Sequence, residues 1–480
     1  MAIPFGSLLP RTSRLRTFVS YSVMLGATAV AYLWIRAQGE QLEAPAATGA
    51  SAAERGAHSS DLAHLLLALG VITLLARVVG GACRRLLGQP PVIGEILAGI
   101  LLGPSVLGAL WPEAQHFLLP ESVAPALGVV SKIGVVLFMF LVGLDLDPRL
   151  LRGNTHSTIA VSHASIVAPF LLGATLALWL YPLYSSASVG FTAFSLFLGV
   201  SLSITAFPVL ARILRDRRVQ GTRLGVTALA CAAVDDVSAW TLLALVVGIA
   251  TATMSGAVWT IAYVAAYVAL MMLVVRPLMQ RWFVAREERY EGPLSHSALA
   301  FVFVALLGSA LATEWIGIHA LFGAFLLGAI LPNEGRLARE LRSRIEDVVL
   351  VLFLPSFFAF TGMRTSIGLV EGSRDWMFCG LIVLTAVVGK FGGSLFAARL
   401  TGMSWRHSAA LGVLMNTRGL MELIVLNLGL DLGVISPTIF TMMVIMALVT
   451  TFMTTPLLDL LLGRRGFGDP PPDALPARTP

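Results

Sequence analysis

The chain has 480 residues, of which 57% are hydrophobic and only 12% are charged, and its formal net charge is +6. Soluble domains carry about 25% charged residues, so this composition excludes a single soluble domain and predicts a polytopic membrane protein. The basic residues cluster in short loops between apolar stretches, which is typical of cytoplasmic loops and not of a nucleic-acid-binding surface.

Fourteen stretches are long and apolar enough to cross a bilayer, which takes about 20 residues per helix. We therefore predict an all-α membrane protein of 13 to 14 transmembrane helices. The stretches are residues 17–35, 62–82, 91–110, 123–146, 157–182, 190–214, 222–250, 257–280, 296–314, 318–332, 346–365, 376–399, 406–430 and 437–462.

The N-terminal stretch has two interpretations. Arg11, Arg14 and Arg16 before an apolar run are typical of a signal peptide, but residues 17–35 are long for one, which favours a retained helix. Residues 37–61 are predicted to be an exposed linker and the Pro-rich tail after Arg465 to be disordered, with no room for a nucleotide-binding regulatory domain. The expected division is an N-terminal helix and linker at 1–61, a transmembrane domain at 62–462 and a tail at 463–480.

The loops alternate in charge along the chain. Arginines gather in the loops that follow residues 82, 146, 214, 280, 332, 399 and 462, whereas the intervening loops carry mainly glutamate and aspartate. The positive-inside rule then places both termini in the cytoplasm.

Two segments recur in the second half of the chain. GEILAGILLGP at residues 94–104 is echoed by GAFLLGAILP at 323–332, and FMFLVGLD at 138–145 is echoed by FFAFTGMR at 357–364. The loop charges make the paired segments cross the membrane in opposite directions, which predicts an inverted-topology repeat with substrate bound between the halves. The alternative is that small residues such as Gly99 and Gly103 only pack helices.

Two adjacent aspartates, Asp235 and Asp236, lie in the apolar stretch 224–250. A carboxylate at mid-membrane costs about 2.5 to 3.5 kcal/mol on insertion scales, so the pair predicts an ion or proton pathway. The alternative is a structural pair neutralised by a buried base.

Helix-disrupting residues occur at corresponding places in the two halves: SLSITAFP at 201–208 and MNTRG at 415–419. Two broken helices that cross can hold a cation between Asp236 and hydroxyl or carbonyl oxygens, and Ser203 and Thr205 are the candidate hydroxyls. Taken singly, each break can also be a kink in a packing helix.

The remaining intramembrane charges need partners. Lys390 lies deep in its predicted span and should pair with a carboxylate. Because adjacent helical residues point about 100° apart, one of the two aspartates can pair with Lys390 while the other faces the ion cavity. Arg418 and Glu422 have the i, i+4 spacing of a structural salt bridge. Glu95, after a Pro-Pro pair, is either a cation-attracting entrance residue or an interfacial charge.

No cofactor or metal site is predicted. Cys83, Cys231 and Cys379 are isolated, and neither an H-E-x-x-H motif nor a phosphate-binding G-x-x-x-x-G-K-[ST] loop is present, which argues against ATP-driven transport by this chain alone.

Four motifs in order resemble those of the cation:proton antiporter-2 family of monovalent cation/proton exchangers: PPVIGEILAG at 90–99, TAFPVLAR at 205–212, VDD at 234–236 and NTRGLMEL at 416–423. The resemblance covers about residues 62–462. It implies a homodimer in which each protomer has a dimerisation domain and a mobile core with two crossed, partly unwound helices.

The resemblance also implies roles for single residues. Asp236 matches the aspartate that carries ion or proton, and Asp235 matches an acidic neighbour typical of electrogenic members, paired in some with a lysine at the place of Lys390. Glu422 departs from many bacterial sodium/proton members, in which the acid directly follows the glycine of this motif. The extra helix at 17–35 and the missing C-terminal sensing domain depart from the Kef-type plan.

The sequence thus predicts a secondary antiporter that exchanges protons for Na⁺ or K⁺ across a bacterial inner membrane, with the cation and the stoichiometry left open. A passive cation channel would need a continuous lined pore, and an intramembrane aspartyl protease would need two carboxylates facing each other across a peptide. A non-transporting ion sensor is a further alternative. Matched helix breaks beside a buried lysine favour alternating access.

Overall fold

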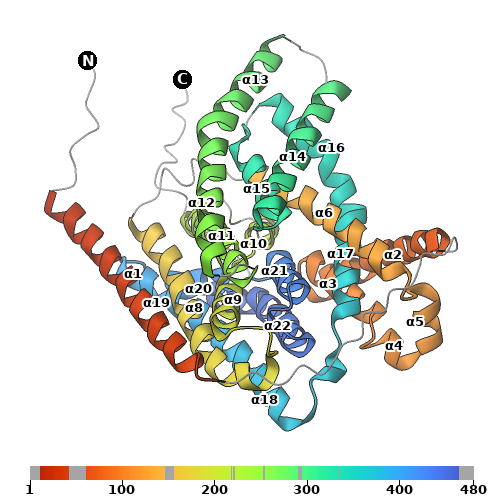
Figure 1. Ribbon diagram of the computed structural model, residues 1–480, viewed down its shortest axis with the longest axis horizontal. Helices are drawn as coiled ribbons and strands as arrows, with labels where there is room; N and C mark the ends of the chain where they lie inside the picture. The colour runs from red at the N-terminus through yellow and green to blue at the C-terminus, as the bar shows by residue number, and fades with distance from the viewer. Residues whose placement is uncertain are drawn as a thin grey trace.

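The computed structural model describes residues 11–42, 61–145, 156–217, 219, 222–251, 254–289, 294–332 and 335–463. All regular structure in these residues is helical, which confirms the predicted all-α class (Figure 1). Most of the predicted linker and the predicted disordered tail, residues 43–60 and 464–480, lie outside the described residues, as do the loop arginines Arg149, Arg152 and Arg218.

The helices follow one another in this order: α1 (Arg11–Gly39), α2 (Asp61–Leu87), α3 (Pro91–Leu102), α4 (Leu107–Leu110), α5 (Pro112–Leu118), α6 (Val123–Asp145), α8 (His156–Tyr184), α9 (Phe191–Ser203), α10 (Phe207–Asp216), α11 (Arg223–Thr251), α12 (Met254–Leu270), α13 (Arg276–Arg289), α14 (His296–Ile316), α15 (Ala320–Ile330), α16 (Arg336–Val348), α17 (Leu354–Arg364), α18 (Gly372–Val387), α19 (Gly393–Leu400), α20 (Trp405–Met415), α21 (Leu420–Asp431) and α22 (Pro437–Leu462). Three π-helical segments, η1 (Met271–Val275), η2 (Val349–Phe353) and η4 (Val388–Gly392), connect α12 to α13, α16 to α17 and α18 to α19, and a 3₁₀ turn, η3 (Ile367–Leu369), precedes α18.

Each of the fourteen predicted spans coincides with a helix or a helix pair, but fewer qualify as membrane-crossing. Within the described residues, eleven helices are long and apolar enough to span a bilayer, and the bent pair α20 and α21 raises the number to twelve. α15 has 11 residues and is too short at 1.5 Å per residue to cross a core about 30 Å thick. α1 is not among the eleven and is less apolar than α2 or α6.

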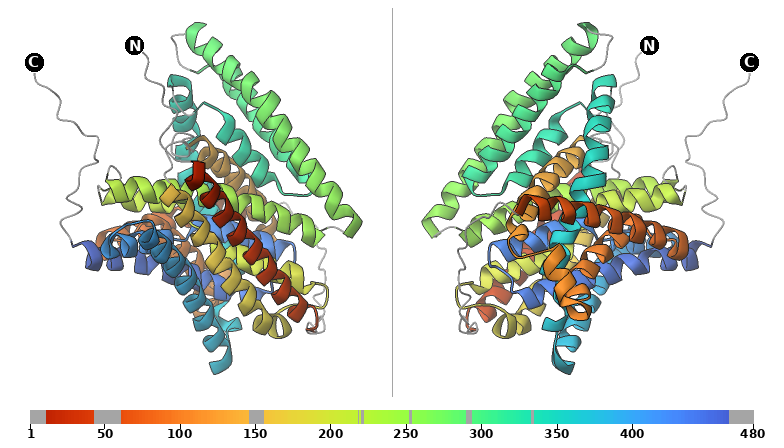
Figure 2. Two further views of the ribbon diagram at one scale, coloured as in Figure 1. Left: turned by 90° about the vertical axis from the view of Figure 1, so that its left-hand side faces the viewer. Right: turned by 90° about the vertical axis from the view of Figure 1, so that its right-hand side faces the viewer.

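The main helix contacts divide the molecule into two bundles. We call α2–α6 with α14–α17 the scaffold bundle, and α8–α11 with α18–α22 the core bundle; α12 and α13 lie along the scaffold side (Figure 2). α1 packs on α8 and α9 of the core bundle, where the Tyr32 hydroxyl donates to the Thr192 carbonyl at 3.2 Å.

Glycines at matched positions allow close helix crossings inside the scaffold bundle. A Cβ atom added to Gly99 of α3 would lie 2.1 Å from the Phe358 carbonyl oxygen of α17, and one added to Gly362 of α17 would lie 2.0 Å from the Gly99 carbonyl carbon. Gly328 of α15 and Gly143 of α6 meet in the same way. A Cβ atom added to Gly328 would lie 2.2 Å from a carbonyl oxygen of α6, and one added to Gly143 would lie 2.1 Å from a carbonyl oxygen of α15.

These two crossings reconcile the two interpretations of the repeated segments. The glycines do pack helices, and the aligned repeats pair Gly99 with Gly328 and Gly143 with Gly362. Each crossing therefore joins one helix of each repeat, as an inverted repeat requires.

Candidate ion-binding site

Two interrupted helices cross in the core bundle, at the positions that the sequence predicts. α9 ends at Ser203 and α10 begins at Phe207, while α20 and α21 are separated by residues 416–419 and bent by 43°. Gly419, with a φ of 153°, adopts a conformation that disfavours residues with a Cβ. The breaks touch through the backbone, because the Ala206 N–H donates to the Thr417 carbonyl at 2.9 Å.

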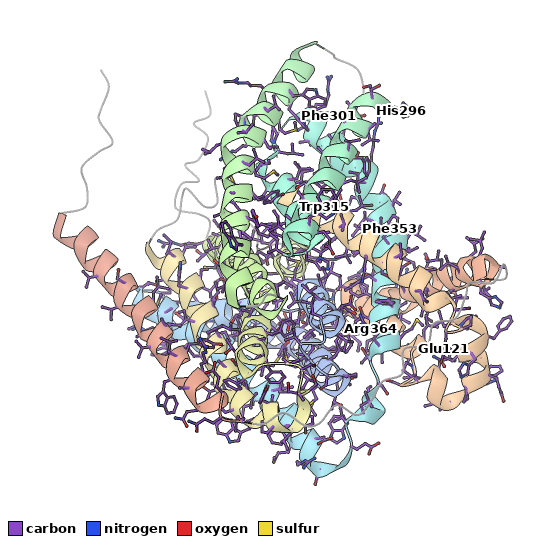
Figure 3. All side chains as sticks on the ribbon, in the orientation of Figure 1. Glu121, His296, Phe301, Trp315, Phe353 and Arg364 are labelled. Carbon is purple, nitrogen blue, oxygen red and sulfur yellow. The ribbon has the colours of Figure 1, made fainter. Side chains whose placement is uncertain are left out.

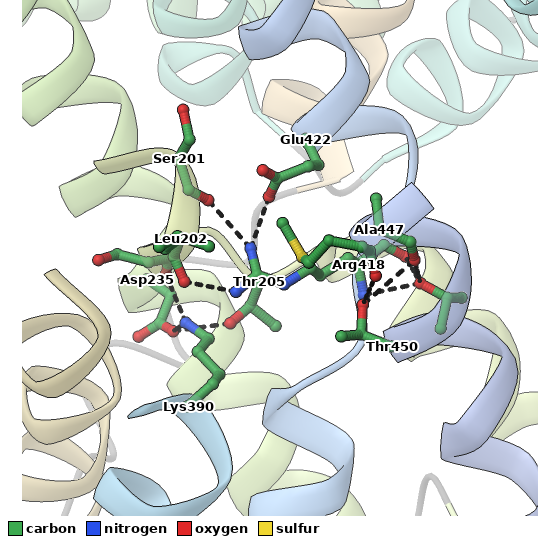
Figure 4. Close-up of polar contacts among 12 residues, drawn as sticks. Ser201, Leu202, Thr205, Asp235, Lys390, Arg418, Glu422, Ala447 and Thr450 are labelled. Carbon is green, nitrogen blue, oxygen red and sulfur yellow. Dashed lines mark hydrogen bonds and ion pairs between the residues drawn. The ribbon is translucent and has the colours of Figure 1, made fainter. Parts of the chain in front are cut away.

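Asp235 of α11 is fully buried and accepts hydrogen bonds from four side chains, of which Thr205 and Lys390 are labelled in Figure 4. The hydroxyls of Ser162 and Ser165 on α8 donate at 2.6 and 2.7 Å, and the Thr205 hydroxyl at the α9–α10 break donates at 2.8 Å. The Lys390 ammonium completes the set at 2.9 Å. This carboxylate is held in one position by three different segments of the chain.

Lys390 lies in the π-helical segment η4, and its side chain is 0% exposed. Its ammonium also donates to the Ser203 carbonyl at the C-terminal end of α9. The predicted Asp235–Lys390 ion pair is therefore present. π-helical segments of this kind occur frequently at functional sites.

Arg418 covers the rest of the C-terminal end of α9. Its guanidinium donates to the carbonyls of Ser201 and Leu202 and forms an ion pair with Glu422 at 2.7 Å (Figure 4). The last carbonyls of a helix have no partner within the helix and carry a partial negative charge, so a cation there is stabilising. The Arg418–Glu422 pair has the structural geometry expected from its spacing, and Glu422 in turn lies in the first turn of α21.

Asp236 differs from its neighbour in every contact. It is 1% exposed, and among the residues that the structure describes neither of its carboxylate oxygens has a hydrogen-bond partner. Its side chain lines a small cavity between the helix breaks and α11, together with Ile204, Ala239, Leu243, Met421 and Val425. A buried, unpaired carboxylate is costly, and a proton or a cation would remove that cost.

Two candidate hydroxyls do not point at Asp236. The Thr205 hydroxyl contacts the Asp235 carboxylate and the Met415 carbonyl, the latter at 3.1 Å. The Ser203 hydroxyl donates to the carbonyls of Gly199 and Ile166, at 2.7 and 3.0 Å. The structure does, however, leave the buried side-chain oxygens of Asn416 and Thr417 in the second break without partners.

Glu95 lies away from this cluster. It is half-buried on α3 in the scaffold bundle, where Arg77 of α2 and Arg212 of α10 act on it electrostatically. Within the described part of the chain, no hydrogen bond or ion pair joins Glu95 to either aspartate. Its place beside α10 puts it at the boundary between the bundles.

Ser162 and Ser165 are the functional candidates that sequence reasoning missed. Their i, i+3 spacing within a predicted span places both hydroxyls on one helix face. That pattern was a usable signal for a polar partner on a neighbouring helix.

Comparisons with known proteins identify the family and the fold of this chain. A family model described as "Sodium/hydrogen exchanger, transmembrane" matches residues 45–462. The chain is 45% identical to the Na(+)/H(+) antiporter NhaS4 of Synechocystis over 82% of this chain and 95% of the relative. It is 40% identical to Cation/H(+) antiporter 17 of Arabidopsis thaliana and 34% identical to K(+)/H(+) antiporter 1 of Saccharomyces cerevisiae, over 82% and 78% of this chain.

The chain spans about half the length of these plant and yeast relatives, 48% and 43%. Among solved structures, the sodium proton antiporter MjNhaP1 of Methanocaldococcus jannaschii at pH 8 matches with a TM-score of 0.62 and 14% identity, over 83% of this chain and 96% of that one. This likeness establishes a shared fold.

Proposed function

The chain belongs to the sodium/hydrogen exchanger family of membrane transporters and is not an enzyme, and we propose that it exchanges a monovalent cation for protons by alternating access, with Asp236 binding each in turn. The observation that carries the proposal is the environment of Asp236. It is buried, lines a cavity and has no hydrogen-bond partner for either oxygen.

One carboxylate with two alternative occupants couples the two fluxes. A proton neutralises Asp236 directly, and an alkali cation neutralises it while drawing further oxygen ligands from the adjoining helix breaks. Both cannot bind at once, so loading one ion from one side requires release of the other. The unpaired Asn416 and Thr417 oxygens are the additional ligands that we propose.

Asp235 has a supporting role in this scheme. Four donors already contact it, so a cation would have to compete with them for its oxygens. Protonation of Asp235 would remove the ion pair with Lys390, whose ammonium would then keep its hydrogen bond to the Ser203 carbonyl. An electrogenic cycle would move a proton at this ion pair in addition to the ion carried by Asp236.

The names of the relatives and the loop charges support the remaining assignments. Relatives named as Na⁺/H⁺ and K⁺/H⁺ antiporters favour Na⁺ or K⁺ as the cation. We further propose that residues 62–462 form the transport unit, that it works as a homodimer in a bacterial inner membrane, and that both termini face the cytoplasm.

Proton flux in everted vesicles tests the proposal. Asp236→Asn should abolish the pH change that Na⁺ or K⁺ evokes in vesicles with normal protein abundance. Glu113→Gln, which alters an exposed carboxylate on α5, is the matched control and should exchange normally. Persistent exchange in Asp236→Asn would refute the assigned aspartate, and cation flux without proton movement in the unaltered protein would indicate a channel.

A further inference from the structure

An ion-pair cluster joins the two bundles at the C-terminal end of α21. Asp431 of the core bundle contacts Arg364 of α17 at 2.6 Å and Lys132 of α6 at 3.0 Å, and both bases belong to the scaffold bundle. Asn427, one turn earlier on α21, accepts from Arg364 at 3.0 Å and donates to the Thr361 hydroxyl at 2.8 Å. We call Lys132, Arg364 and Asp431 the α21 latch.

The ion pairs of the latch lie near solvent, so breaking them should cost little stability. Arg364 lies on α17 of the scaffold bundle (Figure 3), and its guanidinium carbon is 5.1 Å from the centroid of the Phe360 ring on the same helix. The Arg364 and Asp431 side chains are 23% and 27% exposed, and Lys132 is 61% exposed. Ion pairs this close to solvent are individually weak.

The latch lies beside a route toward Asp236. A cavity of about 250 Å³ between the bundles is lined by Lys132 and Asp431 at one end and by Ile424 and Leu428 of α21 deeper in. Met421 and Val425, on the same helix and nearer to the break, line the Asp236 cavity. Separating the bundles at the latch would widen the approach from this face.

The repeat provides a counterpart at the opposite membrane face. Asp145 follows Gly143 by two residues, as Arg364 follows Gly362, and these two glycines occupy matched places in the two scaffold crossings. The partner of Arg364 is at the end of α21, and the matching half-helix α10 ends near Arg215. The charges are exchanged between the two faces. At one face the scaffold carries the base, Arg364, and the core carries the acid, Asp431. At the other face the scaffold carries the acid, Asp145, and the core carries the base, Arg215.

The counterpart is not closed in this structure. Asp145 is paired with Arg342 of α16, inside its own bundle, while the exposed Arg215 acts on it electrostatically without forming an ion pair. Arg212 and Glu95 repeat this relationship one turn deeper, again with the base on α10 and the acid on the scaffold.

We propose that Arg364–Asp431 and Asp145–Arg215 are alternating gates, so that one cross-bundle ion pair forms when the other breaks. The inference rests on alternating access as proposed above and assigns residues to it. A core bundle that rocks against the scaffold must close at one face as it opens at the other. Exchanged charges at matched positions allow one rigid-body motion to trade one ion pair for the other.

Pairwise cross-linking tests the alternation. The three buried cysteines are first replaced by alanine, and thiols are introduced as Arg364→Cys with Asp431→Cys and as Asp145→Cys with Arg215→Cys. In the four-thiol protein in membranes, a short bifunctional thiol reagent should link either pair. Molecules already linked at 364 and 431 should form the 145 to 215 link about tenfold less often than unlinked molecules.

Two control pairs separate gating from loss of structure. Asp145→Cys with Arg342→Cys lies within the scaffold, and Arg217→Cys with Asp459→Cys lies within the core, since Arg217 and Asp459 are paired there. Both should link equally well whether or not residues 364 and 431 are linked. Arg364→Ala removes the Arg364–Asp431 ion pair without adding a thiol and leaves only the Lys132–Asp431 pair, so it should raise the yield of the 145 to 215 link.

Two results would overturn the proposal: equal 145 to 215 yields with and without the first link, or no such link while the scaffold control forms. These yields do not depend on which carboxylate binds the ion. Exchange that persists in Asp236→Asn would therefore refute the assigned aspartate and leave the cross-linking result standing.

Discussion

Asp235 and Asp236 are neighbours in sequence and opposites in environment: four side chains donate to the first carboxylate and none to the second. The helix geometry that separates their directions by about 100° sends one toward α8 and Lys390 and the other into a cavity. The pair thereby divides into a charge held by four donors and a buried charge that we propose to be the exchangeable one.

The ion pair should be visible as a thermodynamic coupling. Lys390→Ala leaves Asp235 without its cation in a dry interior, and breaking a buried pair in this way costs roughly 3 to 5 kcal/mol. Adding Asp235→Asn removes the stranded charge, so the double variant should lose less stability than the sum of the singles, with a coupling of roughly 0.5 to 3 kcal/mol. Thermal unfolding in detergent measures all four corners of the cycle, and strict additivity would contradict the pair.

Competition at Asp236 predicts how cation affinity depends on pH. A proton and a cation neutralise the same carboxylate, so at acid pH the protonated form predominates and cation binding weakens. As the pH rises, the apparent affinity should increase and then level off once the carboxylate has lost its proton. Cation titrations of exchange at several pH values provide the measurement, and an affinity that stays constant across the active range would indicate separate sites.

The α8 serines should matter for stability before they matter for ion binding. Ser162→Ala and Ser165→Ala each remove a hydrogen bond to the buried Asp235 carboxylate, which is worth about 1.5 to 3 kcal/mol for a charged acceptor. We expect lower melting temperatures in both, with cation exchange retained. Ser373→Ala, at an exposed position in the first turn of α18, is the control. Loss of cation affinity at unchanged stability would instead make these serines ligands.

The sequence predicted those parts of the site whose burial in a membrane span costs free energy. A carboxylate pair, a deep lysine and two matched helix breaks are expensive in an apolar stretch, so each signals a partner, and Asp235 with Lys390 is found as a pair. A single hydroxyl carries a much weaker signal, because it is cheap to bury in a helix. A serine in a helix can return its hydrogen bond to its own helix, as Ser203 does to Gly199, or reach across, as Ser162 does to Asp235.

The α21 latch was also beyond sequence reasoning, for a different reason. Arg364 and Asp431 lie at the ends of apolar segments, where charges are cheap because water is near. Nothing in the sequence separates such a charge from one that pairs across a bundle boundary. The glycine pairs, by contrast, were predictable, since only the absence of a Cβ permits crossings in which backbone atoms lie this close.

The glycine crossings yield a paired prediction for the two repeats. The new Cβ would lie 2.1 Å from a backbone carbonyl oxygen in Gly99→Ala and 2.2 Å from one in Gly328→Ala. The neighbouring helix would have to move to relieve either clash. Overpacking of this kind costs about 1 to 3 kcal/mol or more, and matched positions should lose similar stability. Gly308→Ala on α14, with nothing within 4 Å of its added Cβ, should be neutral or stabilising in the same thermal assay.

The last prediction separates structural charge from ion binding in the second helix break. Arg418→Gln removes the guanidinium from the end of α9 and leaves Glu422 as an unpaired buried acid. Glu422→Gln leaves Arg418 bound to the Ser201 and Leu202 carbonyls. Arg418→Gln should therefore destabilise the protein more. Glu422→Gln should therefore fold at reduced stability and keep the cation affinity of the unaltered protein. Melting temperatures together with cation titrations in vesicles test both statements. A Glu422→Gln protein that melts normally but no longer responds to Na⁺ or K⁺ would transfer the cation-binding role from Asp236 toward α21.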